Sequence, residues 1–348
     1  MAEYISFQPS DFFSTTLFTG TGSTLAVTGV GFQPDLVWQK NRSITSNHLW
    51  TDAVRGTDSQ IYCSSNSAEG TLTNVLTSFD SDGFTAGTSS DFNGSTNLIA
   101  TWNWKAGTAS GITGGTITPT SYSINTTSGF GIYEFTGTGS AGTIAHGLGV
   151  APQMVIVKKT NTTGDWYVYH KNMPSGNGYH MTLNTSAIPA SGTEWNSTDP
   201  TSTVFSLGAN SNVNASAATF MAYAFAPIKG YSQFGSYTAN GALDGPFIYT
   251  GFRPAFVMLK ASVDGTNHWC LFDPKRTPYN PEAPLFADNT DNESTVGTGY
   301  PLDIVSNGFK PRSASSQTNS ISYGSPYIYA AFAEFPIVSS NDVPGVAR

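Results

Sequence analysis

Gly31-Phe32-Gln33-Pro34-Asp35-Leu36-Val37-Trp38-Gln39-Lys40 is the stretch that decides the fold, because the chain repeats its pattern twice more. In each copy a glycine-x-x-proline step leads into an apolar run that ends in lysine, and a tryptophan closes the next element. The repeated anchors are Pro34, Pro152 and Pro254; Lys40, Lys158 and Lys260; and Trp50, Trp166 and Trp269. The prolines stand 118 and 102 residues apart, a spacing that predicts a small domain copied three times.

The composition predicts an all-β chain. Charged residues make up only 11% of the 348 residues, and 36 glycines and 19 prolines supply turns, while runs of strong helix formers are absent. Short β-branched and aromatic runs bounded by turn residues favour three tandem antiparallel β-sandwich domains of a jelly-roll-like kind. The expected strands lie at 35–39, 98–104, 153–158, 219–226, 255–260 and 327–335.

The three copies divide the chain into segments. We expect an N-terminal arm at 1–17, sandwich repeats at 18–110, 131–230 and 231–336, a linker at 111–130 and a C-terminal tail at 337–348. The arm carries the aromatic residues Tyr4, Phe7, Phe12 and Phe13. They are too many for a free solvated tail, so we expect them to bury against another subunit, where a few aromatic anchors can dominate affinity.

Charge and motifs argue against several classes of function. The formal charge is −8, and Lys and Arg are scattered along the chain, so the sequence predicts no basic patch that would bind nucleic acid. No apolar stretch is long enough for membrane insertion, and the start of the chain lacks the pattern of a secretory signal. The five histidines have no metal-ligand spacing, and no nucleophile elbow or phosphate loop is present. We therefore expect no catalytic residues, no metal and no cofactor, and two unpaired, buried cysteines.

Aromatic residues are abundant, at 13% of the chain, and allow a different reading. Exposed aromatic side chains flanked by Asn and Asp bind sugars by stacking. A possible glycan platform comprises Tyr167, Tyr169, Tyr179 and Trp195, although aromatic residues at repeated strand positions are more often part of a core.

The first copy resembles a repeat domain of uncharacterised function that occurs in virion structural proteins of marine tailed bacteriophages. The resemblance rests on Gly31 to Arg42, His48 to Gly56, Ser81 to Thr85 and Trp102 to Gly107, and on the leader Phe7 to Phe13. It covers roughly a third of the chain, since the other copies match only at the Gly-x-x-Pro step, the lysine, the tryptophan and the final strand. That family has no catalytic motif to transfer.

The resemblance implies a non-enzymatic structural protein on the surface of a bacteriophage virion, made in the cytoplasm of the host bacterium. Its expected partners are other capsid or tail proteins and copies of itself. A head decoration or appendage is favoured, because no heptad run suggests a tail-fibre shaft. Two alternatives stay open: a tail-associated protein that binds host-surface glycans, and a tailspike hydrolase, for which no carboxylate pair can be located.

Burial of the repeated tryptophans is a further expectation. If each one fills the core of its own copy, its replacement by alanine costs about 3–5 kcal/mol and splits the thermal unfolding of the chain into separate steps.

Overall fold

The computed structural model describes residues 7–107, 111–174, 176–263, 265, 267–277, 281, 283–293, 299–320 and 325–335. Within these residues the chain is all-β, with six antiparallel sheets and few helical residues. They include η1 (Pro9–Asp11), α1 (Ser90–Asn93), η2 (Gly176–Gly178) and α2 (Ser211–Asn214). In this part of the chain no helix has the length and apolarity needed to cross a membrane.

The strands fall into three successive units, each made of one large and one small sheet. The first unit contains β1 (Phe13–Thr19), β2 (Leu25–Thr28), β3 (Leu36–Asn41), β4 (Leu49–Asp52), β5 (Ser59–Tyr62), β6 (Gly70–Thr71), β7 (Leu76–Asp80), β8 (Gly83–Ala86) and β9 (Leu98–Trp104). Its large sheet has the order β1-β9-β3-β4-β5-β6, and its small sheet the order β2-β8-β7.

The second unit repeats this plan with one more strand in the large sheet. It contains β10 (Ser121–Asn125), β11 (Phe130–Thr136), β12 (Gly142–Ala145), β13 (Met154–Lys159), β14 (Trp166–His170), β15 (Tyr179–Thr182), β16 (Ala190–Ser191), β17 (Val204–Leu207) and β18 (Thr219–Phe225). The large sheet has the order β10-β11-β18-β13-β14-β15-β16, and β12 pairs with β17.

The third unit closes the series. It contains β19 (Ser232–Thr238), β20 (Ile248–Tyr249), β21 (Arg253–Ala261), β22 (Cys270–Phe272), β23 (Leu285–Phe286), β24 (Leu302–Val305), β25 (Gly308–Pro311) and β26 (Pro326–Phe335). Its sheets have the orders β19-β26-β21-β22-β23 and β20-β25-β24. In every unit the last strand therefore lies beside the lysine-bearing strand, and its other neighbour is β1, β11 or β19.

The six strands expected from the sequence are all present, within one or two residues at each end. Each repeated proline precedes or lies within the lysine-bearing strand, and each lysine is the penultimate residue of that strand. The constant spacing between proline and lysine thus reflects a constant register, since a slip of one residue would exchange the two faces of the strand.

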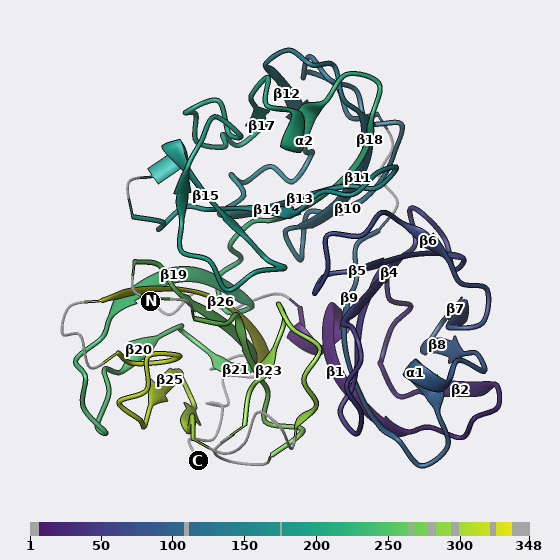
Figure 1. The fold of residues 1–348 in the computed structure, drawn as a ribbon, viewed down its shortest axis with the longest axis vertical. Helices are drawn as coiled ribbons and strands as arrows, with labels where there is room; N and C mark the ends of the chain where they lie inside the picture. The colour runs from purple at the N-terminus through teal and green to yellow at the C-terminus, as the bar shows by residue number, and fades with distance from the viewer. Residues whose placement is uncertain are drawn as a thin grey trace.

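The large sheets of the three units face one another, and the small sheets lie on the outside (Figure 1). Side chains alternate along each strand, so both faces of a large sheet are covered. In β18, for example, Tyr223 joins a central cluster shared by all three units, whereas Ala222 faces the outer cluster of the second unit. The outer clusters of the first and third units are separate. The three units are therefore fused through one central core.

The strands correct two of the expected boundaries. The first strand begins at Phe13, inside the segment expected to be an arm, and pairs along its whole length with β9. The expected linker at 111–130 contains β10, which pairs with β11 as part of the second large sheet. The expected arm ends just before the opener at Phe18, which is the penultimate residue of β1, and the expected linker starts with a Gly- and Thr-rich run that leads into β10. The expected tail at 337–348 lies outside the described residues.

Candidate functional site

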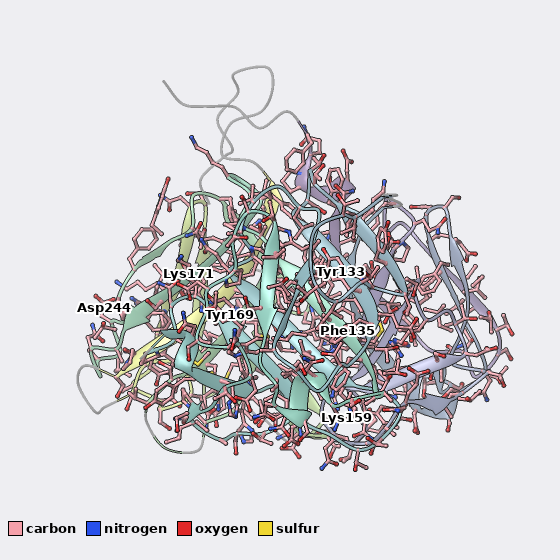
Figure 2. All side chains as sticks on the ribbon, turned by 90° about the horizontal axis from the view of Figure 1, so that it is seen from above. Tyr133, Phe135, Lys159, Tyr169, Lys171 and Asp244 are labelled. Atoms are coloured by element: carbon pink, nitrogen blue, oxygen red, sulfur yellow. The ribbon has the colours of Figure 1, made fainter. Side chains whose placement is uncertain are left out.

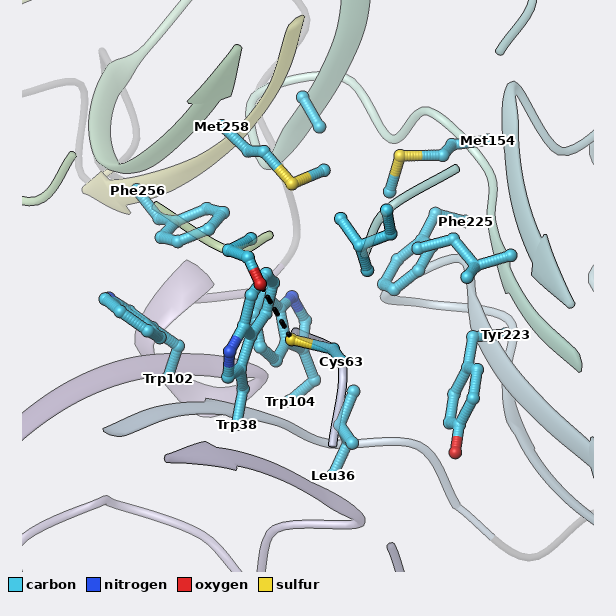
Figure 3. Packing of buried hydrophobic residues seen from close by; sticks show 14 of the residues in the cluster. Leu36, Trp38, Cys63, Trp102, Trp104, Met154, Tyr223, Phe225, Phe256 and Met258 are labelled. Carbon is cyan, nitrogen blue, oxygen red and sulfur yellow. Dashed lines mark hydrogen bonds between the residues drawn. The ribbon is translucent and has the colours of Figure 1, made fainter. Parts of the chain in front are cut away.

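The central cluster is the most extensive packed region that the three units share. Trp38, Trp102 and Trp104 from the first unit pack against Phe256 from the third, with ring centroids 5.6–6.2 Å apart (Figure 3). A void of about 10 Å³ remains where the three sheets meet. It has room for no more than a single water molecule, so the region between the three large sheets is a packed core and not a ligand pocket.

The register of the strands corrects the alignment of the repeated tryptophans. Lys158 pairs with Trp166, and by the same register Lys260 lies opposite Trp269 and Lys40 opposite His48. The backbone carbonyls of His48, Trp166 and Trp269 accept equivalent hydrogen bonds from Cys63, Leu183 and Ala287. His48 is thus the counterpart of Trp166 and Trp269, and Trp50 lies two residues further on, opposite Trp38.

All three repeated tryptophans are buried, with at most 1% of each exposed. They do not fill separate cores, however, because each belongs to the central cluster. Trp166 Nε1 donates to the carbonyl oxygens of Tyr62 at 3.0 Å and Ser65 at 3.1 Å, both in the first unit. Trp269 Nε1 donates to Thr182 of the second unit at 2.9 Å. These indoles link one unit to the preceding one.

His48 occupies the position of these tryptophans in the first unit. Its Nδ1 accepts a hydrogen bond of 3.0 Å from Trp38 Nε1, so in the neutral imidazole the proton is on Nε2. Nε2 faces the third unit, where the carbonyl of Phe286 acts on it. Burial, with the charges of Lys40 and Arg276, holds the pKa of His48 well below its usual range. The histidine is therefore neutral, and its Nε2 is buried without a hydrogen bond to the described residues, unlike the indoles of Trp166 and Trp269.

The repeated lysines form a second ring. Each is fully buried, and its Nζ donates both within its own unit and to a loop of another. Lys40 Nζ lies 2.5 Å from the carbonyl oxygen of Ser46 and 3.0 Å from that of Thr290 in the third unit. Lys158 Nζ lies 2.8 Å from the Gly164 carbonyl.

Lys158 and Lys260 make the same kind of contact at the remaining two interfaces. Lys158 Nζ lies 3.4 Å from the carbonyl oxygen of Asn66 in the first unit. Lys260 Nζ donates to Asn267 of its own unit and, at 2.8 Å, to Ser186 of the second unit. Each lysine thus contacts the preceding unit in a closed head-to-tail ring, which is the arrangement that a heterologous interface generates when its rotation closes.

Burial lowers the pKa of each of these lysines from 10.5 to about 8. Above about pH 8 the folded protein loses these protons, whereas the unfolded chain keeps them until about pH 10.5. Each lysine therefore makes the free energy of unfolding rise with pH within that window. The buried thiols of Cys63 and Cys270, whose pKa burial raises, act in the opposite direction.

We expect Lys158→Met to reduce this pH-dependent gain by about a third, because one of three similar groups is removed. Urea unfolding at about pH 7 and about pH 9.5 measures the gain, and comparison between variants cancels the contribution of the thiols. Lys171→Met, which changes an exposed lysine of the same unit, should leave the gain unchanged. An equal gain in the Lys158→Met protein would contradict the assignment.

A buried ion pair forms a third set of contacts between units. Asp52 and Arg55 lie 2.6 Å apart and are at most 2% exposed, and Asp52 Oδ2 accepts a hydrogen bond of 2.8 Å from Tyr223 of the second unit. Asp273 and Arg276 form the same pair in the third unit, where Asp273 accepts from Trp102 of the first at 3.3 Å.

In the second unit a neutral pair takes the place of the ion pair. His170 replaces the aspartate, and Met173 replaces the arginine. His170 Nε2 lies 3.1 Å from the carbonyl oxygen of Tyr329 in the third unit, and burial lowers the pKa of His170 to about 4. The contact with a neighbouring unit is therefore kept without a buried charge.

Three buried asparagines, which sequence reasoning missed, fix the loops that open the repeats. Asn93 Oδ1 accepts from the backbone N–H of Thr21, and its Nδ2 donates to Ser23 and Gly87. Asn214 and Asn319 make the corresponding contacts in the other units. Their spacing in the sequence could have identified two of them, because Asn93 and Asn214 both stand five residues before the last strand of their unit.

The possible glycan platform is not exposed. Tyr167, Tyr169 and Trp195 are only 8%, 1% and 2% exposed and lie in the outer cluster of the second unit. Tyr169 also donates a hydrogen bond of 3.0 Å to Asp199. Tyr179 is half-buried and packs against the central cluster. The buried rings of Tyr167, Tyr169 and Trp195 cannot stack on a sugar, so these residues do not form an exposed platform.

The described aromatic residues of the expected arm are already packed within the chain. Phe13 is 2% exposed and lies 5.0 Å from Trp104 and 5.4 Å from Phe332, measured between ring centroids. Phe7 and Phe12 pack edge-to-face on Tyr231, at the start of the third unit. Phe13 is therefore buried within its own chain, whereas a contact of the half-buried Phe7 and Phe12 with another subunit stays a prediction. Tyr4 lies outside the described residues.

A further pair of titratable groups lies in the second unit. His180 Nδ1 lies 2.9 Å from Glu194 Oε2, and Glu194 Oε1 accepts hydrogen bonds from Asn210 and Asn212. Burial raises the pKa of Glu194, but the interaction with His180, together with the hydrogen bond from Asn212, outweighs burial and holds the pKa below its usual value. The carboxylate thereby binds the loop that leads into α2. Among the described residues no group of three or more His, Cys, Asp or Glu is placed to hold a metal ion.

Comparison with known proteins gives one match. A family model described as "Domain of unknown function (DUF7483)" matches residues 8–336, which span all three units. No curated protein and no solved structure matches the chain. The match treats the ring of three units as one domain, in agreement with the shared central core.

Proposed function

The chain belongs to the DUF7483 family, and we propose that it is a non-enzymatic structural protein of a bacteriophage virion. The observation that carries the proposal is the closed ring of contacts between the units. Lysines and buried acidic or histidine side chains contact a neighbouring unit at every interface, and tryptophan indoles add to these contacts. Buried polar groups whose hydrogen bonds are satisfied make the contacts between units rigid. A rigid body suits a structural component of a particle.

The proposal extends to the fold and to the place of the protein on the particle. Each unit is a β-sandwich of its large and its small sheet, fused to the other two through the central cluster. The small sheets and their loops form the outer surface (Figure 1), so partners meet loops and not the repeated core. A body with approximate threefold symmetry fits an exposed position on a particle built from symmetric capsid or tail proteins. Head decoration or an appendage is the favoured role, and the resemblance of the first unit to virion proteins supports it.

Localisation on purified particles tests the proposal. Immunogold labelling with an antibody against the protein is expected to mark the outside of intact particles, and quantitative mass spectrometry should find it at a fixed stoichiometry to the major capsid protein. Labelling at the head vertices or faces supports decoration, and labelling at the tail tip supports the tail-associated alternative. Recovery of the protein only from the soluble fraction of the lysate would overturn the structural role.

The non-enzymatic part of the proposal has a separate readout. The purified protein is expected to release no reducing sugars from host envelope polysaccharide over a time in which a known depolymerase exhausts the substrate. Release of sugars at a rate proportional to protein concentration would support the tailspike alternative instead.

A further inference from the structure

One outer sheet, that of the third unit, presents large apolar side chains to solvent. Leu243, Phe247 and Tyr249 are 73%, 50% and 63% exposed. Phe247 and Tyr249 flank Ile248, which is buried in the outer cluster of the unit. Because side chains alternate along a strand, both rings project from the solvent face of the β20-β25-β24 sheet. Gly308 pairs with Tyr249 on the neighbouring strand, so no side chain stands beside that ring on β25.

The fold does not require aromatic residues at these positions. Val27, Ile144 and Ile248 are equivalent, because each pairs with the phenylalanine of the opposing strand in its own small sheet. The flanking residues are Ala26 and Thr28 in the first unit, and Thr143 and Ala145 in the second. Two small sheets thus form without aromatic side chains on this face, and the exposed rings of the third unit need another explanation.

Charged side chains border the two rings on the same face. Lys310 follows Phe309 on β25 and pairs with Asp303 on β24, and its Nζ lies 2.9 Å from Asp244 Oδ1. Arg312 contacts Asp244 and lies 3.3 Å from Asp303. Asp244 is at the outer edge of the molecule (Figure 2). Two carboxylates and two cations balance, so the border carries no net charge.

We propose that this face, formed by Phe247, Tyr249, Asp244, Lys310 and Arg312, binds a neutral polysaccharide chain. Aromatic rings stack on the apolar faces of sugar rings. The Phe247 ring lies over Gly308, the residue that pairs with Tyr249, so both rings occupy one part of the sheet face. Carboxylate oxygens accept hydrogen bonds from sugar hydroxyls, and guanidinium and ammonium groups donate to them. The balanced charge selects against strongly anionic or cationic ligands.

This inference goes beyond the structural role proposed above and does not rest on it. A surface that holds a glycan suits a head appendage as well as a tail-associated protein. Failure of the glycan experiment would leave the localisation experiment unaffected, and the reverse also holds.

Isothermal titration calorimetry with maltohexaose, cellohexaose and N-acetylchitohexaose tests the site. At least one of these neutral oligosaccharides is expected to bind the complete protein, and Phe247→Ala/Tyr249→Ala should weaken its binding by at least about tenfold. Ile188→Ala is the matched control, because it shortens an apolar side chain of similar exposure, 47%, in the second unit. It should bind as the unchanged protein does. The melting temperatures of all three proteins should agree, since each altered side chain is at least 47% exposed.

Three results would overturn the proposal. The first is the absence of binding by all three oligosaccharides at millimolar concentration. The second is equal affinity of the double variant and the unchanged protein. The third is a concentration-dependent dimer in sedimentation experiments that the double variant abolishes, because the face would then belong to a contact between copies of this chain.

Discussion

Replacing Arg55 by methionine is expected to lower the free energy of unfolding by about 3–5 kcal/mol. Arg55 is the partner of Asp52, whose side chain is completely buried, and removal of one member of a buried ion pair leaves an uncompensated charge in the interior. Asp52 also accepts the hydroxyl of Tyr223 from the second unit, so the defect lies where two units meet. Chemical denaturation at neutral pH measures the loss.

The second unit supplies the control for this substitution. It carries His170 and Met173 where the first unit carries Asp52 and Arg55, and His170 still contacts a neighbouring unit. The double variant Asp52→His/Arg55→Met copies this neutral pair and should recover most of the stability that Arg55→Met loses. The double-mutant cycle then gives the coupling between the two positions. A double variant as unstable as the sum of the single changes would show that the charges themselves are not the cause.

The part of the fold that the sequence predicts well is the part that repeats with fixed spacing. The step from Pro152 to Lys158 recurs without insertion, so it predicted the strand, its register and the common position of the lysine. The loops of the neighbouring units that receive the lysines could not be predicted. The acceptors are backbone carbonyls, for example those of Asn66 and Ser186. Every residue has a backbone carbonyl, so the sequence does not reveal which one accepts the hydrogen bond.

The tryptophan alignment failed for a related reason. His48 and Trp166 stand eight residues after their lysines, whereas Trp50 stands ten residues after Lys40. Matching tryptophan with tryptophan therefore aligned Trp50 with Trp166, although the counterpart of Trp166 in the first unit is His48. The burial of Tyr167 and Tyr169 could not be predicted either, because both faces of the large sheet that contains β14 are covered and alternation no longer separates exposed from buried residues.

The shared core changes the expected outcome of a tryptophan deletion. Trp166→Ala should cost about 3–5 kcal/mol, the usual range for an aromatic residue removed from a core. The expected thermogram nevertheless has one transition and not several. Trp166 packs on Trp50 with ring centroids 5.1 Å apart and donates to the Tyr62 carbonyl, both in the first unit, so loss of the indole weakens two units together.

Trp195→Ala provides the comparison, because Trp195 is as buried as Trp166 but lies in the outer cluster of the second unit alone. Both variants should melt in one step in differential scanning calorimetry, at lower temperature than the unchanged protein. They should differ in amide hydrogen exchange. Only Trp166→Ala is expected to speed exchange at Cys63, whose N–H donates to the His48 carbonyl in the first unit, since Trp195 does not contact that segment. Two resolved calorimetric peaks for Trp166→Ala would show that the units unfold independently, and the central cluster would then be a contact between three domains and not one core.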